Sequence, residues 1–325
     1  FAGIEGYRGV IENCDLVILA APPHFRADHV EAAVEAERHL FVEKPVATDV
    51  PSLLRVEAAS ERAKELSLTL VGGLCYRYSR AKCDTLERVH GGAVGDIVAM
   101  QCTYNTSELW LRECKLPPTH LEYQVRNWLY FNWLSGDLIA EQHIHSLDKL
   151  AWAMNDWPVA ATSSGGRVVR TDAACGNVYD HFNTVYEWSN GVRGFSSCRQ
   201  WNGVANDVSD WVFGTEGRAE LQSHRIERRD GDNWRWRSDE PDDMYQLEMD
   251  ELLRSVRDGA VVNDGEVLCR STLMALMGRM AAYTGERITL ERARSSKEDL
   301  RPEGGYGWRE IGVRPIARPG FTKFV

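Results

Sequence analysis

The feature that most constrains the fold is a series of short apolar segments that alternate with helical segments between residues 15 and 74. Residues 15–22 (DLVILAAP) form a continuous apolar run that ends at a Pro-Pro pair, which is typical of a strand buried on both faces of a parallel sheet. A helix is expected over 24–37, a second strand over 39–45, a helix over 51–66 and a third strand over 68–74. This alternation with short connections predicts a doubly wound parallel sheet of the Rossmann type.

A Rossmann sheet usually carries G-x-G-x-x-G directly after its first strand, and this chain has no such motif. The chain also begins at Phe1 and not at Met. We therefore expect the first strands and the glycine loop to precede Phe1, so that residues 1–79 form the C-terminal half of a dinucleotide-binding domain. Any export signal would lie in the same preceding segment. We expect a cytoplasmic protein and leave an exported or periplasmic location open.

The pattern changes after residue 80, and residues 80–325 are expected to form a second, α+β domain. A helix over 80–91 precedes a long helix over 136–154, and β-rich segments with turn signals fill 158–225. Two amphipathic helices are expected over 244–258 and 267–284. We predict a large, mostly antiparallel open sheet with helices against one face. Two domains suit a chain of 325 residues.

The formal charge of −10 argues against nucleic acid or an anionic membrane as a partner, because both attract a basic surface. No segment approaches the ~20 apolar residues of a membrane span. The eight cysteines include no C-x-x-C pair, so a zinc ribbon has no support. Ordinary globular composition, with 43% hydrophobic and 26% charged residues, leaves an enzyme or a small-molecule binding protein.

The tripeptide Glu43-Lys44-Pro45 stands at the carboxyl end of a predicted parallel strand. Open α/β sheets bind their ligands at these strand ends. A lysine at this position can hydrogen-bond a substrate hydroxyl or alter the pKa of a neighbouring group. The alternative interpretation is an ordinary surface lysine on a turn.

A second candidate is the segment GDLIAEQHIHSLDKLAW, residues 136–152. On one continuous helix Glu141, His145 and Asp148 would share a face, because they are spaced i, i+4 and i+7. A histidine between carboxylates is a candidate general base with orienting partners, although a structural histidine fits the same pattern. The pair His143 and His145 would diverge by ~200° on a helix, so we expect no metal site.

Together these segments resemble the glucose–fructose oxidoreductase / inositol dehydrogenase / rhizopine-catabolism (Gfo/Idh/MocA) family over nearly the whole chain. The matching motifs are AAPPH at 20–24, VEKP at 42–45, Tyr76-Arg77 after the third strand, E-x-x-x-H-x-x-D at 141–148 and GTEG at 214–217. The family's usual lysine and histidine correspond to Lys44 and His145. Its acidic residue four positions before the histidine is usually Asp and is Glu141 here, which makes the role of Glu141 less defined.

The resemblance implies an oxidoreductase that binds NAD or NADP and acts on a sugar, a cyclitol or another polyol. Lys44, His145 and Glu141 are the expected catalytic residues. The expected cofactor-binding residues are Ala20, Ala21, Pro22, Pro23, His24, Glu43, Lys44 and Arg77. The expected substrate-binding residues are Tyr76, Arg126, Trp128, Asp148 and Tyr179, since aromatic faces and polar side chains suit a sugar. The open sheet is expected to form a homodimer or homotetramer.

As a mechanism we expect His145 to take the hydroxyl proton, Lys44 to hydrogen-bond the same oxygen, and Glu141 and Asp148 to orient the imidazole. Three alternatives stay open at this point. One is a glycosidase that uses tightly held NAD for transient oxidation and elimination. The second is a non-catalytic member that binds nucleotide or sugar, and the third is a truncated chain without a cofactor site of its own.

Overall fold

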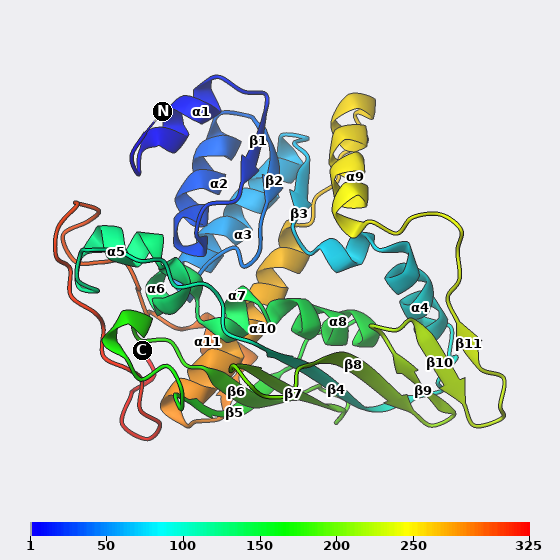
Figure 1. Cartoon of the computed structure of the whole chain (residues 1–325). Helices are drawn as coiled ribbons and strands as arrows, with labels where there is room; N and C mark the ends of the chain where they lie inside the picture. Colours follow the sequence, from blue (N-terminus) through cyan, green and yellow to red (C-terminus); the bar gives the residue numbers. More distant parts are fainter. Residues whose placement is uncertain (1) are drawn as a thin grey trace.

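The computed structural model describes residues 2–325 and contains two sheets with helices packed between and around them (Figure 1). The N-terminal part comprises α1 (Gly6–Glu12), β1 (Leu16–Leu19), the 3-10 turn η1 (Pro23–Phe25), α2 (Arg26–Glu35), β2 (His39–Val42), α3 (Val50–Glu65), β3 (Leu70–Gly72) and the 3-10 turn η2 (Cys75–Tyr78). The three strands and two helices expected between residues 15 and 74 are present. The helix expected over 80–91 is present as α4 (Arg80–His90).

The small sheet has the strand order β1-β2-β3, and both pairings are parallel, with Leu16 opposite His39 and Leu40 opposite Leu70. Its alternating side chains bury one face against α2 and α3 and the other against α9 (Met244–Asp258). Because both faces are covered, the strands read as continuous apolar runs. The strand β1 lies at the edge of the sheet, where the side chain of Ile18 is 61% exposed.

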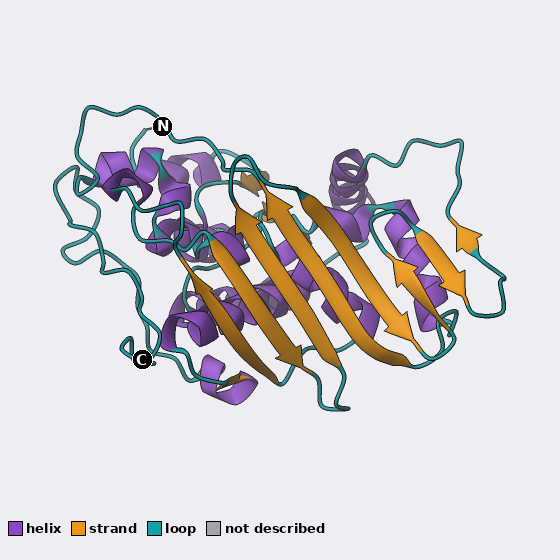
Figure 2. Cartoon of the chain, turned by 60° about the horizontal axis from the view of Figure 1, so that its bottom comes forward, coloured by secondary structure: helices purple, strands orange, loops and turns teal. Residues whose placement is uncertain are grey.

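The large sheet contains nine strands in the order β11-β10-β9-β8-β4-β7-β6-β5-β12. Its members are β4 (Ile97–Thr106), β5 (Ala160–Gly166), β6 (His181–Glu187), β7 (Arg193–Gln200), β8 (Asp207–Gly214), β9 (Gly217–Glu220), β10 (Arg225–Arg228), β11 (Trp234–Arg235) and β12 (Ile288–Thr289). Only β4 and β7 pair in parallel, so the predicted mostly antiparallel sheet is confirmed. Helices cover one face, and Figure 2 shows the other face open.

The remaining helices connect the two sheets. They are α5 (Leu121–Arg126), η3 (Trp128–Tyr130), α6 (Asn132–Ser135), α7 (Leu138–Glu141), α8 (Ile144–Met154), η4 (Ala173–Cys175), α10 (Gly265–Thr284) and α11 (Leu290–Arg294). The central helix α10 contributes Leu268 to the core beneath β3 and Met277 to the core beneath the large sheet. A domain boundary at residue 79 stays a prediction, and the late helices α9 and α10 both contact the first sheet.

One predicted element is wrong in detail, because the helix expected over 136–154 is broken. Gly136 and Asp137 adopt positive φ angles of 78° and 73°, and α7 ends before α8 begins. At the break the side chain of His143 is completely buried and bonds to Ser196 Oγ at 2.6 Å. The amide of Gln200 also donates to Gln142 Oε1 at 2.7 Å. These side-chain contacts with β7 stabilise the break between α7 and α8. Glu141 and His145 therefore lie on different helices and do not share one helical face.

Within residues 2–325 no helix is both long enough and apolar enough to cross a bilayer. The same part of the chain gathers no group of three or more His, Cys, Asp or Glu side chains suited to hold a metal ion.

Candidate active site

Lys44 leaves the carboxyl end of β2 and reaches the end of α7. Its ammonium group donates a hydrogen bond to the carbonyl oxygen of Glu141, and Nζ lies 3.6 Å from Oε1 of the same residue. Both side chains are largely buried, with 13% and 14% of their surface exposed. Lys44 is therefore not a free surface lysine. The two sequence motifs, 97 residues apart, meet at this contact.

His145 lies in the first turn of α8, and part of the residue remains accessible. Burial, followed by the positive charges of Lys44 and Lys149, holds its pKa well below the usual histidine value. Its Nδ1 atom is buried and has no hydrogen-bond partner among the described residues. The ring of Tyr76 meets the His145 ring edge-on, with the centroids 5.3 Å apart. The imidazole is thus neutral at pH 7 and able to accept a proton.

The structure gives no support to the expectation that Glu141 and Asp148 orient His145, because both carboxylates bond to other groups, and that role stays a prediction. Glu141 pairs with Lys44, as described above. The Asp148 carboxylate accepts from Nε and Nη2 of Arg77, each at 2.9 Å, and from the hydroxyl of Ser271 at 2.6 Å. Asp148 is 1% exposed, so its contact with a substrate stays a prediction that this burial does not favour. Its observed role is to hold Arg77.

The segment after β1 contains donors suited to a dinucleotide. In the described part of the chain the main-chain amides of Ala20 and Ala21 donate to no other group, and Ala20 is exposed at the carboxyl end of the strand. Such free amides at a strand end fit the polar edge of a cofactor. Pro22 and Pro23 then turn the chain into η1. Two other residues expected at the cofactor lie near the same centre. Glu43 accepts a hydrogen bond from the main-chain amide of Lys44, and Arg77 forms the ion pair with Asp148.

His24 is placed differently from the expectation. It is 4% exposed, its Nε2 lies 2.7 Å from the hydroxyl of Tyr306, and its ring packs edge-on against Trp133. Burial lowers the pKa of His24 to about 4. The side chain therefore belongs to the packing beneath η1, and only its main chain remains a candidate for cofactor contact.

Three expected substrate residues make no hydrogen bond, ion pair or ring contact with Lys44, Glu141 or His145. Arg126 forms an exposed ion pair with Glu122 on α5. Trp128 packs in a separate apolar cluster and meets Trp110 edge-on. Tyr179 is 2% exposed and donates from its hydroxyl to the carbonyl of Ala317. Their contact with a substrate stays a prediction, and the structure gives it no support.

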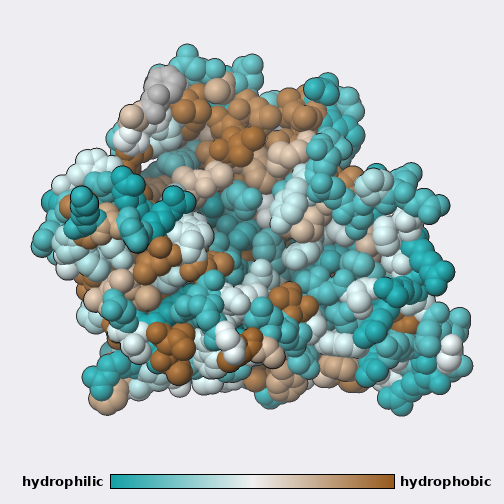
Figure 3. All heavy atoms as spheres, in the orientation of Figure 1, coloured by the Kyte–Doolittle hydropathy of each residue, from teal (hydrophilic) through white to brown (hydrophobic). Residues whose placement is uncertain are grey.

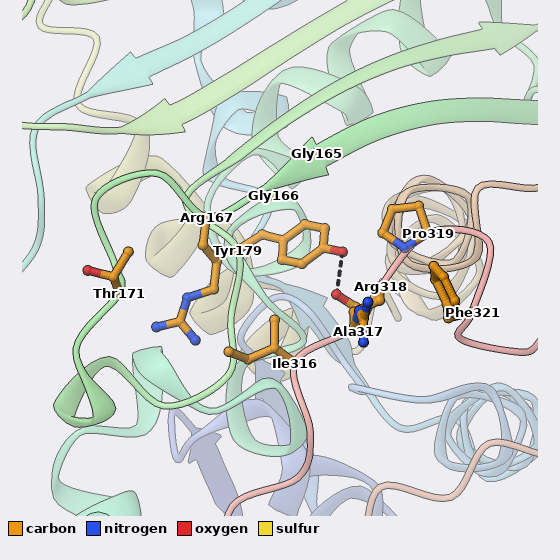
Figure 4. Close-up of a pocket in the computed structure, with 10 residues that line it drawn as sticks. All are labelled: Gly165, Gly166, Arg167, Thr171, Tyr179, Ile316, Ala317, Arg318, Pro319 and Phe321. Atoms are coloured by element: carbon orange, nitrogen blue, oxygen red, sulfur yellow. Dashed lines mark hydrogen bonds between the residues drawn. The ribbon is translucent and has the colours of Figure 1, made fainter.

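Figure 4 shows the surroundings of Tyr179, whose ring points toward the C-terminal segment. The pocket there has a volume of about 460 Å³. Its lining consists of the end of β5, the following loop and residues 316–321. It includes none of the residues around Lys44 and His145. Figure 3 shows a separate recess on the face toward the viewer, below the apolar upper part of the molecule and lined with hydrophilic side chains.

Sequence reasoning missed three residues that belong to this site. Burial, followed by Tyr76 and Glu141, raises the pKa of Tyr104 to about 12, and its ring centroid lies 6.2 Å from that of His143, two residues before His145. Arg26 is 4% exposed and donates to the carbonyl oxygen of Pro45 at 2.5 Å, directly after Lys44. Lys149 is completely buried one helical turn after His145. The alternation Met100, Cys102, Tyr104 and the spacing of Lys149 from His145 were the available signals.

Fold and site together define a two-part α/β protein with a parallel, dinucleotide-binding type of sheet and a lysine–histidine centre at the carboxyl ends of its strands. The oxidoreductase family model with an NAD-binding Rossmann fold matches residues 5–71, and the Gfo/Idh/MocA C-terminal domain model matches residues 85–220. The chain belongs to the Gfo/Idh/MocA family. The resemblance seen in the sequence is confirmed, and a nicotinamide dinucleotide is the cofactor of its Rossmann fold.

Individual relatives are more distant. The scyllo-inositol 2-dehydrogenase (NAD+) of Bacillus subtilis is 25% identical over 205 residues, which cover 62% of this chain and 54% of that protein. A glycosyl hydrolase family 109 protein of Streptomyces coelicolor is 30% identical over 144 residues, covering 44% of this chain and 28% of that protein. The chain spans about half the length of the first curated relatives it matches.

Among solved structures, the aldose-aldose oxidoreductase of Caulobacter crescentus complexed with glycerol superimposes with a TM-score of 0.71 at 19% identity. The match covers 88% of this chain and 82% of that chain. At this identity the likeness shows the shared fold alone.

Proposed function

We propose that this chain carries the reacting centre of an NAD(P)-dependent oxidoreductase that transfers hydride between the nicotinamide and a secondary hydroxyl of a sugar or cyclitol. The observation that carries the proposal is the arrangement of a buried lysine ammonium beside a neutral, partly accessible histidine at the carboxyl ends of the parallel strands. The inositol dehydrogenase among the relatives supports the substrate class.

In this proposal His145 accepts the proton of the substrate hydroxyl, for which a neutral imidazole is required. Lys44 donates a hydrogen bond to the same oxygen and stabilises the negative charge that develops on it. Glu141 holds the Lys44 ammonium through its carbonyl and carboxylate. Arg26 secures the chain after Lys44 through the Pro45 carbonyl. Ala20 and Ala21 amides, with Glu43, are proposed to contact the cofactor, which when bound supplies the hydride acceptor.

Aromatic side chains complete the proposed substrate site. Tyr76 stands edge-on to His145, and Tyr104 from β4 meets the ring of His143, with the centroids 6.2 Å apart. Aromatic rings with hydroxyl groups suit the partly apolar faces and polar rim of a sugar. We propose these two tyrosines as substrate contacts in place of Arg126, Trp128 and Tyr179.

We also propose that the open face of the large sheet forms the contact between subunits of a homodimer or homotetramer. Phe195 and Val98 on this sheet are 49% and 54% exposed, and Trp211 stacks on Phe213 with the ring centroids 6.2 Å apart. An uncovered sheet face with such side chains is typical of an interaction surface.

The test is absorbance at 340 nm with the full-length protein, NAD or NADP, and a panel of sugars, cyclitols and aryl glycosides. We expect steady NAD(P)H formation with one polyol, and a loss of kcat of about 10²–10⁴-fold in Lys44→Met and His145→Gln. Lys115→Met and His90→Gln, at exposed positions, serve as matched controls and should retain activity. Release of aryl alcohol without net NAD(P)H would indicate a glycosidase instead. Equal activity in all four variants would exclude Lys44 and His145 from the reaction.

A further inference from the structure

Tyr76 connects His145 to two buried lysines that the proposed function does not use. The Tyr76 and His145 rings meet edge-on, with 5.3 Å between their centroids. The Nζ atoms of Lys149 and Lys82 lie 4.3 and 4.5 Å from the centroid of the same ring. A cation within about 6 Å of an aromatic face is attracted by the ring, so both lysines restrain Tyr76.

Lys149 is the more firmly held of the two. It follows His145 by four residues on α8 and therefore lies on the same helical face. Its side chain and that of Asp210 on β8 are both completely buried, and they form a hydrogen-bonded ion pair. Lys82, on α4, is 5% exposed and forms no ion pair among the described residues. Asp210 thus fixes the Lys149 ammonium between the large sheet and Tyr76.

Stability alone gives little reason for such a pair. A buried ion pair loses so much hydration that apolar residues of the same volume are often equally stabilising or better. The position of this pair beside the Tyr76–His145 contact points to another role. We propose that Lys149 is a positioning residue of the candidate active site, which acts on His145 both through the ring of Tyr76 and through its own positive charge. This inference rests on the proposed role of His145.

Electrostatics act in the same direction as the geometry. The groups that face His145 are Tyr76 from η2, Lys44 from the end of β2, and Lys149 from its own helix. The two ammonium groups oppose a positive imidazolium, so after burial they lower the pKa of His145. Asp210 and Glu141 bond to Lys149 and Lys44 respectively, and they keep both cations in place. Lys149 therefore helps to orient the Tyr76 ring beside His145, and its charge helps to keep His145 neutral.

The test is a pH titration of the histidine rings by NMR in the ¹⁵N-histidine-labelled full-length protein, with the His145 signal assigned from His145→Gln. In the wild type we expect the midpoint of the His145 signal to lie well below the usual histidine value. In Lys149→Met the midpoint should rise by about one pH unit or more, because a nearby like charge is removed. Lys149→Arg should return the midpoint toward the wild-type value.

Lys82→Met is the matched control, because it also removes a buried ammonium group near Tyr76. The charges that lower the pKa of His145 are those of Lys44 and Lys149, and not that of Lys82. Its effect on the midpoint should be clearly smaller. If Lys149→Met does not fold, Lys149→Met/Asp210→Asn removes both charges and should show the same upward shift. An unchanged His145 midpoint in either folded variant overturns the proposal. The titration requires no turnover, so its result does not depend on the proposed oxidoreductase function. That function is tested separately by the absorbance at 340 nm.

Discussion

The ion pair between Arg77 and Asp148 allows a prediction that separates a structural role of Asp148 from the substrate contact expected from the sequence. Two guanidinium nitrogens lie 2.9 Å from the carboxylate, and the Ser271 hydroxyl adds a third donor at 2.6 Å. The Asp148 side chain is 2% exposed and the Arg77 side chain is 21% exposed. Asp148→Asn keeps the shape of the side chain and removes its charge.

The expected cost follows from this burial. Breaking a fully buried ion pair destabilises a protein by about 3–5 kcal/mol, because the remaining charge loses its partner. Arg77 retains some access to water, so we expect Asp148→Asn to lower the free energy of unfolding by about 2–3 kcal/mol. The measurement is urea unfolding followed by tryptophan fluorescence, with the slope of the transition compared between variants.

The matched control is Glu122→Gln, which removes the charge of another arginine partner. Arg126 and Glu122 approach to 2.8 Å, but their side chains are 56% and 36% exposed. An exposed pair of this kind contributes at most about 0.5 kcal/mol. The reasoning is refuted if Asp148→Asn costs no more than this control. If it costs no stability but raises KM, Asp148 contacts the substrate as the sequence suggested.

Three further predictions concern other parts of the molecule. The folded-state pKa of His24, about 4, lies below the ordinary value, so its stabilising effect is lost as the pH falls through the window from about 6.5 to 4. Lowering the pH from 7 to 5 should therefore cost about 2 kcal/mol of unfolding free energy through His24 alone. His24→Gln should remove this share of the pH dependence in urea unfolding, whereas the exposed control His90→Gln should leave the pH dependence unchanged. Gly278→Ala should destabilise by about 1–3 kcal/mol despite the better helix propensity of Ala, because its Cβ would clash with Tyr186 Oη and lie 2.7 Å from Ile139 Cδ1. A stabilised variant in thermal unfolding would contradict this packing. Phe195→Lys on the open sheet face should lower the oligomer mass in analytical ultracentrifugation, and an unchanged mass would exclude this face as the contact.

Much of the fold follows from patterns that are local in the sequence. The three parallel strands and their helices were predicted because an apolar run of strand length and an amphipathic helix each reveal their type within about ten residues. The start of α3 also has a local cause, because the Asp49 side chain accepts from Ser52 N at 2.9 Å and a proline occupies the first turn. The position of Lys44 after β2 followed from the same information.

The arrangement of the site was less predictable, because it depends on which distant partners compete for each side chain. Helical spacing alone placed Glu141, His145 and Asp148 on one face. In the structure Glu141 bonds to Lys44, 97 residues earlier, and Asp148 bonds to Arg77, 71 residues earlier. A single sequence contains no signal that ranks these contacts against one another.

The sequence by itself therefore determined the element types, the parallel sheet, the family and the two candidate residues Lys44 and His145. Each of these rests on short-range periodicity or on a motif whose residues are adjacent along the chain. Only the tertiary structure decided that the helix breaks at Gln142 and His143, where Gln200 and Ser196 on β7 hydrogen-bond to their side chains. It alone also placed Tyr76 against both Lys149 and His145, and Tyr104 against His143, because packing brings together groups that are distant along the chain.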